Sequence, residues 1–237
     1  MLTEELLTSG EIITIGRLID ASNATLLCEL SLPNSGSENE RVKVVYKPIA
    51  GERPLWDFPD GNLASREVAA FQLSQFAGFD LVPVTVLREG PFGNGAVQEW
   101  IEVDPEIDVI SIAQSDDPRI RSMALFDYII NNTDRKFGHI LIDSFNSLYG
   151  CDHGVSFHQD LKLRTVLWQF AGETLNDSER QQINKMLGYF SRVSEFLSPL
   201  ISEPEITALR KRLESLRDLD CFPYPNPEWP AIPWPPV

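Results

Sequence analysis

Two charged side chains in the first half of the chain interrupt apolar patterns. Lys47 ends the apolar run 42–47, and Glu67 lies in a stripe of helical i, i+3, i+4, i+7 spacing that runs from Ala64 to Phe71. A carboxylate in an apolar seam is costly to bury unless a cation neutralises it, and Lys47 could supply that charge. An exposed lysine at a strand end and a glutamate that reaches water at the rim of the seam explain the pattern equally well.

Two polar segments in the second half carry groups that could bind a metal ion or move a proton. Residues 131–139 mix acids, bases and hydrogen-bond donors, and the sequence Asp-His-Gly at 152–154 ends a short apolar run. Asp134 and Asp152 thereby offer two carboxylates, as a Mg²⁺ ion needs when it also keeps waters and phosphate oxygens. Ordinary surface turns are the competing interpretation, but the mixture of groups in 131–139 favours a catalytic loop on a rigid scaffold.

The elements that must position these side chains change type along the chain. Short β-rich runs predict strands at 12–15, 25–30, 42–47, 82–88 and 96–101, the last two joined by a connection at 89–95. Between them, an N-cap at Asn62 and a C-terminal Gly78 predict a helix at 63–77. Later segments predict helices at 118–131, 177–190 and 203–219 and short strands at 139–142 and 148–151. This segregation predicts an α+β fold of two lobes with a cleft between them.

The predicted division is a β-rich lobe with one helix at 1–101, a mainly helical lobe with the catalytic and metal loops at 102–220, and a tail at 221–237. The tail holds seven of the 17 prolines and two of the five tryptophans, so we expect an extended, largely polyproline II segment. Disorder is the usual interpretation of such a composition. Trp229 and Trp234 favour docking on the body instead, because an exposed indole leaves apolar area unburied that is worth roughly 2 kcal/mol or more.

The composition is strongly acidic. The 237 residues include 20 Lys+Arg and 35 Asp+Glu, for a formal net charge of −15. Such a surface repels phosphate backbones and anionic lipid headgroups, which argues against a nucleic-acid partner and against stable membrane association. Three widely spaced cysteines form neither a disulfide framework nor a zinc motif, and the acidic N-terminus does not resemble a signal peptide. We therefore expect a cytoplasmic protein.

Taken in order, these features resemble the protein-kinase-like fold, and within it the small bacterial, actinobacterial-type branch of the phosphatidylinositol 3-/4-kinase-like family. The resemblance covers roughly residues 11–168. The strand that ends in Lys47 resembles the nucleotide-contacting lysine strand, and the helix with Glu67 resembles the helix whose glutamate anchors that lysine. Residues 127–135 are similar to the catalytic loop, and 152–154 stand where such kinases carry a metal-binding Asp-x-Gly. The resemblance implies a nucleotide cleft, ATP, and Mg²⁺ or Mn²⁺.

The resemblance also implies roles for the nucleotide-binding residues. Ser22 and Asn23 occupy the phosphate-covering turn, which lacks a glycine-rich pattern, and Glu99 and Trp100 fall in the adenine-binding hinge. The family has a metal-binding Asn at the position of His139. Because Mg²⁺ prefers oxygen ligands and an imidazole suits softer ions, this departure predicts either a preference for Mn²⁺ or a site that binds nucleotide without turnover.

The implied reaction moves the γ-phosphate of ATP to a hydroxyl group. Lys47, held by Glu67, would contact the α- and β-phosphates, while Asp152 and His139 would bind the metal. Asp134 would orient or deprotonate the acceptor hydroxyl.

Further parts of the expected mechanism concern charge. Lys136 would neutralise charge on the γ-phosphate, and Asp127, on the apolar helix, would brace the loop by hydrogen bonds. Lys162 and Arg164 could receive an anionic acceptor, with two solvated cations as the alternative.

The acceptor would be a soluble small molecule, an inositol-type headgroup or a protein. Two other functions stay open. The first is a nucleotide-binding pseudokinase or scaffold that presents its Pro/Trp tail to a protein partner, and the second is AMP transfer by a kinase-like fold.

Overall fold

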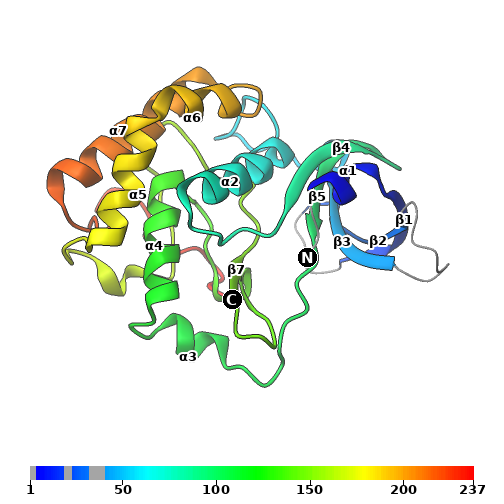
Figure 1. Cartoon of the computed structure of the whole chain (residues 1–237), viewed down its shortest axis with the longest axis horizontal. Coiled ribbons are helices and arrows are strands. Elements are labelled where there is room, and N and C mark those ends of the chain that lie inside the picture. Colours follow the sequence, from blue (N-terminus) through cyan, green and yellow to red (C-terminus); the bar gives the residue numbers. More distant parts are fainter. Residues whose placement is uncertain (1–3, 19–22, 32–40) are drawn as a thin grey trace.

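The β-rich part of the chain forms one antiparallel sheet (Figure 1). The computed structural model describes residues 4–18, 23–31 and 41–237. The sheet has the order β1-β2-β3-β5-β4, with β1 (Glu11–Arg17), β2 (Leu26–Ser31), β3 (Arg41–Pro48), β4 (Thr85–Gly90) and β5 (Gly93–Glu99). The connection between β4 and β5 is shorter than predicted. Gly90 pairs with Gly93, whose φ of 91° is readily adopted by glycine, so the turn contains only Pro91 and Phe92.

A short helix that was not predicted covers part of this sheet. In α1 (Glu4–Ser9), Leu7 is buried in the core of the sheet beside Cys28 and Leu30 of β2. The guanidinium of Arg88 on β4 donates to the carbonyls of Leu7 and Gly10 at 2.8 and 2.7 Å. Six residues with one buried side chain carry too little periodicity to signal a helix.

The helix α2 (Leu63–Ala77) begins and ends where predicted. The side chain of Asn62 accepts a hydrogen bond from the backbone of Ser65 at 2.7 Å, and Gly78 ends the helix with a left-handed φ of 78°. Val68 packs near Ala96 of β5, whereas the next turns join the large core of the helical lobe. The helix therefore bridges the two lobes and carries Glu67 between them.

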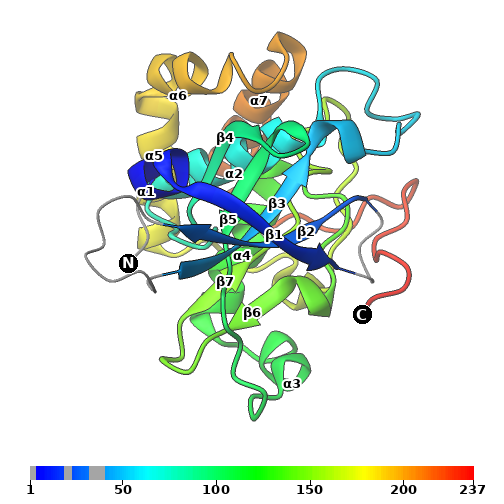
Figure 2. The ribbon, with the colours of Figure 1, turned by 90° about the vertical axis from the view of Figure 1, so that its right-hand side faces the viewer.

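The rest of the chain forms the mainly helical lobe, so the α+β, two-lobed prediction is confirmed (Figure 2). Its helices are α3 (Val109–Ala113), α4 (Pro118–Ile130), α5 (Asp177–Gly188), α6 (Phe190–Leu197) and α7 (Glu203–Leu219). A small hairpin consists of β6 (Ile140–Ile142) and β7 (Leu148–Gly150), and short 3₁₀ turns occupy η1 (Ile49–Gly51), η2 (Phe137–His139) and η3 (Trp168–Phe170). In the part of the chain that is described, no helix combines the length and apolar character needed to cross a bilayer.

The helix predicted at 177–190 is present as α5 and ends two residues earlier, and the helix that follows it, α6, was not predicted. The helix α5 ends at Gly188, and α6 starts at Phe190 after a residue, Tyr189, with a non-helical φ of −111°. Glycine is a poor helix former, so the break falls where the chain is most easily bent.

The tail at 221–237 docks on the helical lobe through one of its two tryptophans. The indole of Trp229 donates to the carbonyl of Lys162 at 3.0 Å. The carbonyl of Ala231 accepts from the backbone of Thr165 and the indole of Trp168 at 3.0 and 2.8 Å. The expected docking of Trp234 is wrong, since this side chain is 89% exposed. The preceding Pro233 is buried, and neighbouring residues of an extended chain point to opposite sides.

Candidate functional site

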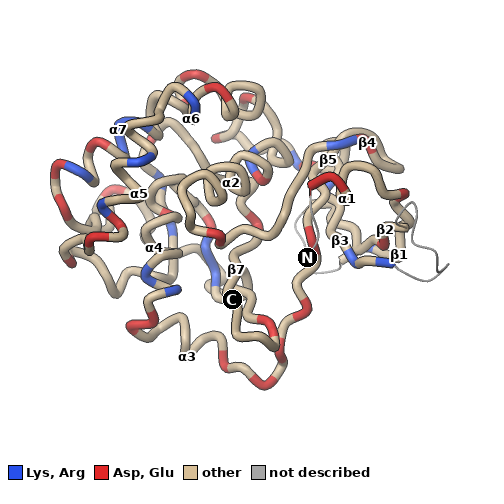
Figure 3. The backbone as a smooth tube through the Cα atoms, viewed as in Figure 1, with Lys and Arg blue, Asp and Glu red and all other residues tan. Residues whose placement is uncertain are grey.

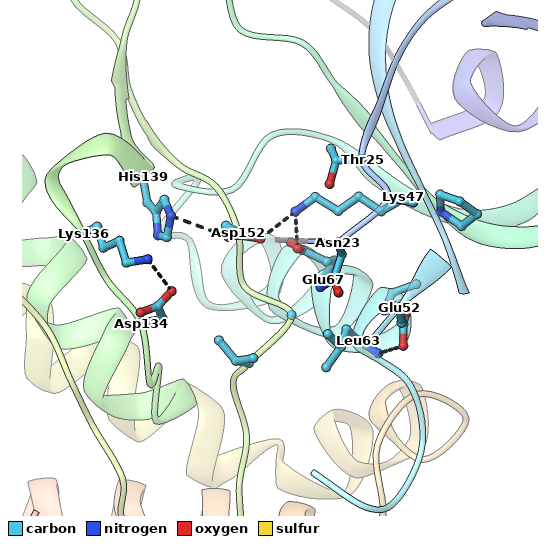
Figure 4. A pocket seen from close by; sticks show the side chains of 15 residues that line it. Asn23, Thr25, Lys47, Glu52, Leu63, Glu67, Asp134, Lys136, His139 and Asp152 are labelled. Atoms are coloured by element: carbon cyan, nitrogen blue, oxygen red, sulfur yellow. Dashed lines mark hydrogen bonds and ion pairs between the residues drawn. The ribbon is translucent and has the colours of Figure 1, made fainter. Parts of the chain in front are cut away.

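A cavity lies where the two lobes meet (Figure 4). Its walls come from the residue stretch before β2, the end of β3, the start of α2, the loop after α4 and the segment after β7. Seven of the predicted site residues line it: Asn23, Lys47, Glu67, Asp134, Lys136, His139 and Asp152. Elements far apart in the sequence thus bring these side chains to one place.

One end of the cavity contains two ion pairs that share Lys47. Its ammonium contacts a carboxylate oxygen of Glu67, which is buried, and lies 3.0 Å from Oδ1 of Asp152. The predicted lysine–glutamate pair is therefore confirmed. The second oxygen of Glu67 accepts a hydrogen bond from the backbone N–H of His153 at 3.0 Å. Glu67 thus joins the β3 lysine to the segment that carries Asp152.

The opposite charges of Lys47 and its partners fix the ionisation of Lys47 and Asp152. Burial lowers the pKa of the Lys47 ammonium, but the carboxylates of Asp152 and Glu67 outweigh it and raise the pKa above 10.5. The ammonium of Lys47 in turn holds the pKa of Asp152 well below its usual range, against the effect of burial. Both groups are therefore charged at neutral pH.

Asp152 also belongs to a cluster of three side chains that could hold a metal ion. One ligand atom from each of Asp134, His139 and Asp152 lies within 4.8 Å of the others. Nε2 of His139 is 3.5 Å from Oδ2 of Asp152, and Oδ2 of Asp134 is 3.1 Å from the ammonium of Lys136. Burial lowers the pKa of His139, so its imidazole is neutral at pH 7 and has a lone pair to offer. Two carboxylates and one imidazole fit a divalent ion of the Mn²⁺ or Mg²⁺ class.

The loop that carries Asp134 and His139 is held by a buried arginine that the sequence reasoning missed. Arg135 and Asp127 of α4 both have 0% exposure and form a two-pronged ion pair. Asp127 also accepts from the side chain of Asn132 at 2.9 Å, as its predicted bracing role requires. The signal was available: a carboxylate on an apolar helix needs a cation, by the argument that identified Lys47 as a partner.

A second missed residue is Glu52 in the cavity wall. Its two carboxylate oxygens accept from the backbone N–H groups of Leu63 and Ala64 at 2.9 and 2.8 Å. They therefore satisfy free donors at the start of α2. Glu52 lies in a loop without periodicity, so nothing in the sequence pattern marks it.

The predicted nucleotide-binding residues of the hinge lie outside the cavity, whereas Asn23 of the predicted phosphate turn lines it. Glu99 and Trp100 follow each other at the end of β5, and neither lines the cavity. The backbone N–H of Glu99 donates to Val84 at 2.9 Å, and that of Trp100 to Lys43 at 3.3 Å. Ser22 lies outside the described residues, next to Asn23.

The two candidate acceptor-binding cations do not line the cavity. The ammonium of Lys162 is 3.6 Å from Asp57 and lies about equally far from the rings of Trp56 and Trp229, at 5.2 and 5.3 Å. Arg164 donates to the carbonyl of Thr133 at 2.6 Å. Both cations are therefore already engaged with the protein.

The fold is similar to that of several solved kinase-like proteins. A hydra Fam20 protein with sugar matches with a TM-score of 0.63 and 16% identity, over 91% of this chain and 86% of that chain. A Golgi casein kinase with Mn/ADP bound matches at 0.59 and 15%, over 94% and 79%. The proinflammatory kinase CtkA of Helicobacter pylori matches at 0.52 and 13%, over 91% and 94%. These likenesses show a kinase-like fold.

A curated protein matches nearly the whole length of the chain. No family model matches the chain. Protein Rv2133c of Mycobacterium tuberculosis is 40% identical to it, over 97% of this chain and 93% of the mycobacterial protein. At that identity and coverage the two proteins share a common ancestor along their length, and the chain belongs to the family of Rv2133c.

Proposed function

We propose that the protein is an ATP-dependent phosphotransferase that moves the γ-phosphate to a hydroxyl group. The observation that carries the proposal is the meeting of the Lys47–Glu67 pair with the Asp134–His139–Asp152 cluster in one cavity between two lobes. A fixed cation for phosphates (Lys47), metal ligands (His139 and Asp152) and a carboxylate beside them (Asp134) are the parts that phosphoryl transfer requires. The structure of a Golgi casein kinase with Mn/ADP bound and the H. pylori kinase support the proposal at the level of fold.

The narrower assignment to the phosphatidylinositol 3-/4-kinase-like family rests on the resemblance of the motifs. In this proposal residues 1–101 form the nucleotide lobe, residues 102–220 the catalytic lobe, and residues 221–237 the tail. Ser22 and Asn23 would cover the phosphates, and Glu99 and Trp100 would form the adenine-binding hinge through backbone groups other than their N–H groups, which are bonded to Val84 and Lys43. We place the reaction in the cytoplasm.

In the proposed roles, Lys47 binds the α- and β-phosphates and Glu67 holds its ammonium in place. Asp152 and His139 hold Mg²⁺ or Mn²⁺, which supplies neutralising charge to the phosphate oxygens when bound. Because Lys47 is already paired with Asp152 at 3.0 Å, nucleotide would enter a cavity whose charges are set in advance.

The other end of the cavity serves the acceptor. Asp134 takes the proton of the acceptor hydroxyl, and the ammonium of Lys136, which lies 3.1 Å from it, neutralises charge on the γ-phosphate. The acceptor we favour is a soluble polyol, a small metabolite or a protein hydroxyl, because a net charge of −15 disfavours an anionic bilayer. Lys162 and Arg164 remain candidates for binding an anionic acceptor, provided that it displaces their present partners.

The test is to incubate purified protein with ATP and either Mg²⁺ or Mn²⁺ and to measure ADP by chromatography. We expect ADP formation, with more turnover in Mn²⁺ because an imidazole replaces an oxygen ligand. Absence of ADP under both ions, with every acceptor class supplied, would overturn the proposal.

A second candidate function is a nucleotide-binding pseudokinase, which is favoured by His139 in the metal cluster. It predicts that ADP or ATP raises the melting temperature without any ADP being formed from ATP. AMP transfer is the third candidate, and mass analysis of the modified product distinguishes an added AMP from an added phosphate.

A further inference from the structure

A single guanidinium connects the two backbone segments that carry the candidate metal ligands. Arg135 lies in the loop after α4, one residue beyond Asp134, and is fully buried. Its Nε and Nη2 donate to the carboxylate of Asp127, at 2.9 Å each for the closest contacts. This pair anchors the guanidinium to the central helix of the lobe.

The remaining donors of Arg135 reach the metal-binding segments. Nη1 donates to the carbonyl of His139 at 3.1 Å and to that of Cys151 at 3.0 Å. Nη2 also lies 2.7 Å from Nε2 of His153, which must be the acceptor because an arginine has only donors. All five N–H groups therefore have partners. One of the contacted carbonyls belongs to a candidate ligand, and the other two residues flank Asp152.

The packing around Arg135 leaves no room for the fork to shift. Gly150, the last residue of β7, faces it so closely that an added Cβ would lie 3.0 Å from Nη2 and 3.2 Å from Nη1. A guanidinium held by five hydrogen bonds cannot move aside as a flexible chain end would. Because Gly150 has no side chain, the guanidinium fits between β7 and the loop after α4, and this close fit fixes its position.

We propose that Arg135 is a positioning residue that fixes the distance between His139 and Asp152, and so sets the affinity of the cluster for its metal ion. The inference rests on the proposed function, since it assigns a metal ion to that cluster. A planar fork can hold two carbonyls and an imidazole in fixed directions, whereas a lysine ammonium cannot reproduce its geometry. Groups that orient metal ligands from behind typically account for 10- to 100-fold in metal affinity, so the effect is about tenfold or more.

The alternative is that Arg135 acts only as a buried ion pair that stabilises the lobe. The control for this is Arg121, which also makes several contacts in the same lobe. It bonds the carboxylates of Glu173 and Glu179 and the carbonyl of Thr174, away from the cavity. An Arg121→Lys variant should lose stability without a change in metal binding.

The test measures Mn²⁺ binding directly by the electron paramagnetic resonance signal of the free ion, in the presence of ADP. We expect Arg135→Lys to raise the half-saturating Mn²⁺ concentration about tenfold. Arg121→Lys should leave this concentration within about twofold of the wild-type value, even if the two variants lower the melting temperature equally. Unchanged Mn²⁺ binding in folded Arg135→Lys would overturn the inference.

A second variant decides the question where Arg135→Lys does not fold. Gly150→Ala keeps the arginine and its charge but presses on both Nη atoms, so it should raise the half-saturating Mn²⁺ concentration about threefold or more, a part of the range typical of such groups. Unchanged binding in this variant would contradict the inference. If the wild-type protein itself binds no Mn²⁺ with ADP, the proposed function fails instead, and the two failures are thereby distinguished.

Discussion

The two ends of the cavity are held in place by different means. At the end proposed to bind the nucleotide, Lys47 contacts both Glu67 and Asp152, and the opposite charges keep Lys47 and Asp152 ionised. At the end proposed for the acceptor, Asp134 and Lys136 also form an ion pair, at 3.1 Å, but their loop is held from behind by the buried Arg135 and Asp127. The first end is therefore joined across the lobes by ion pairs, and the second is supported from within the helical lobe.

Acidic and basic residues are unevenly distributed along the backbone (Figure 3). Acidic residues recur in the segment between β5 and α3, including Glu102, Asp104, Glu106 and Asp108. The cavity is lined by two cations, Lys47 and Lys136, and by four carboxylates, Glu52, Glu67, Asp134 and Asp152. A polyphosphate would therefore need the charge of a divalent ion in addition to the two ammonium groups.

The largest effect is expected at Asp152, because it belongs to both ends. The variant Asp152→Asn removes a partner of Lys47 and a carboxylate of the metal cluster together. We expect phosphoryl transfer to fall by roughly 1,000-fold, as for the loss of a main electrostatic contact in an active site. The control is Asp218→Asn on α7, whose side chain is 65% exposed. Equal rates in the two variants would separate Asp152 from the site.

The next variants separate the effect of Lys47 on nucleotide affinity from its effect on the free energy of unfolding. Lys47→Met leaves Glu67 buried without a counter-charge, so we expect the free energy of unfolding to fall by about 3 kcal/mol and nucleotide affinity to fall at least about tenfold.

The double variant Lys47→Met/Glu67→Leu removes both charges. It should regain most of the stability but none of the nucleotide affinity, because a well-packed apolar pair can replace a buried ion pair. Denaturant titration and calorimetry with ADP measure the two quantities. Recovery of nucleotide binding in the double variant would contradict the role of the lysine.

A smaller effect is the pH dependence that His139 contributes to stability. Burial lowers its pKa below the ordinary value of 6.5, so in mild acid the unfolded chain takes up the proton before the folded protein does. Stability is therefore lost as the pH falls below 6.5, by at most about 1.4 kcal/mol per pH unit for one group.

His139→Asn should reduce this loss in denaturant titrations at pH 5.5 and 7.5. The lowered pKa of the buried His153 acts in the same direction, so part of the dependence remains in the variant. An identical pH dependence in the variant and the wild type would show that His139 is not held neutral by the fold.

The last effect concerns stability alone, namely the support that the tail gives to the loop after α4. The carbonyl of Pro236 accepts from the backbone of Phe137, which lies next to Lys136 in this loop. Trp229→Ala should lower the free energy of unfolding by about 2 kcal/mol, whereas Trp234→Ala should change it by less than about 0.5 kcal/mol. Denaturant titration of the two variants makes the comparison, and a larger loss for Trp234 would contradict the docking geometry.

Local signals made much of this architecture predictable. The helix α2 has an asparagine cap and a closing glycine, and α7 begins with a proline in its first turn, so both were placed correctly. Glu67 was visible because one carboxylate in an apolar stripe demands a partner. Asp134, His139 and Asp152 were visible as acids and a base at the ends of apolar runs, although only the fold brings them within 4.8 Å.

The rest depended on contacts between distant parts of the chain. The sequence gives no hint that Trp56 and Trp229 enclose Lys162, because these residues are joined only by tertiary packing. Arg135 was missed although Asp127 called for a cation. The exposure of Trp234 follows from the direction of an extended segment, which composition does not define.

We propose that a nucleotide bound beside Lys47 gives up its γ-phosphate to an acceptor bound beside Asp134. The most direct measurement compares ADP formation and ADP affinity for the wild-type protein and Asp134→Asn under saturating ATP and Mn²⁺. We predict that the variant forms ADP about 100-fold more slowly and binds ADP with nearly the same affinity. Equal rates of ADP formation in the two proteins would contradict it.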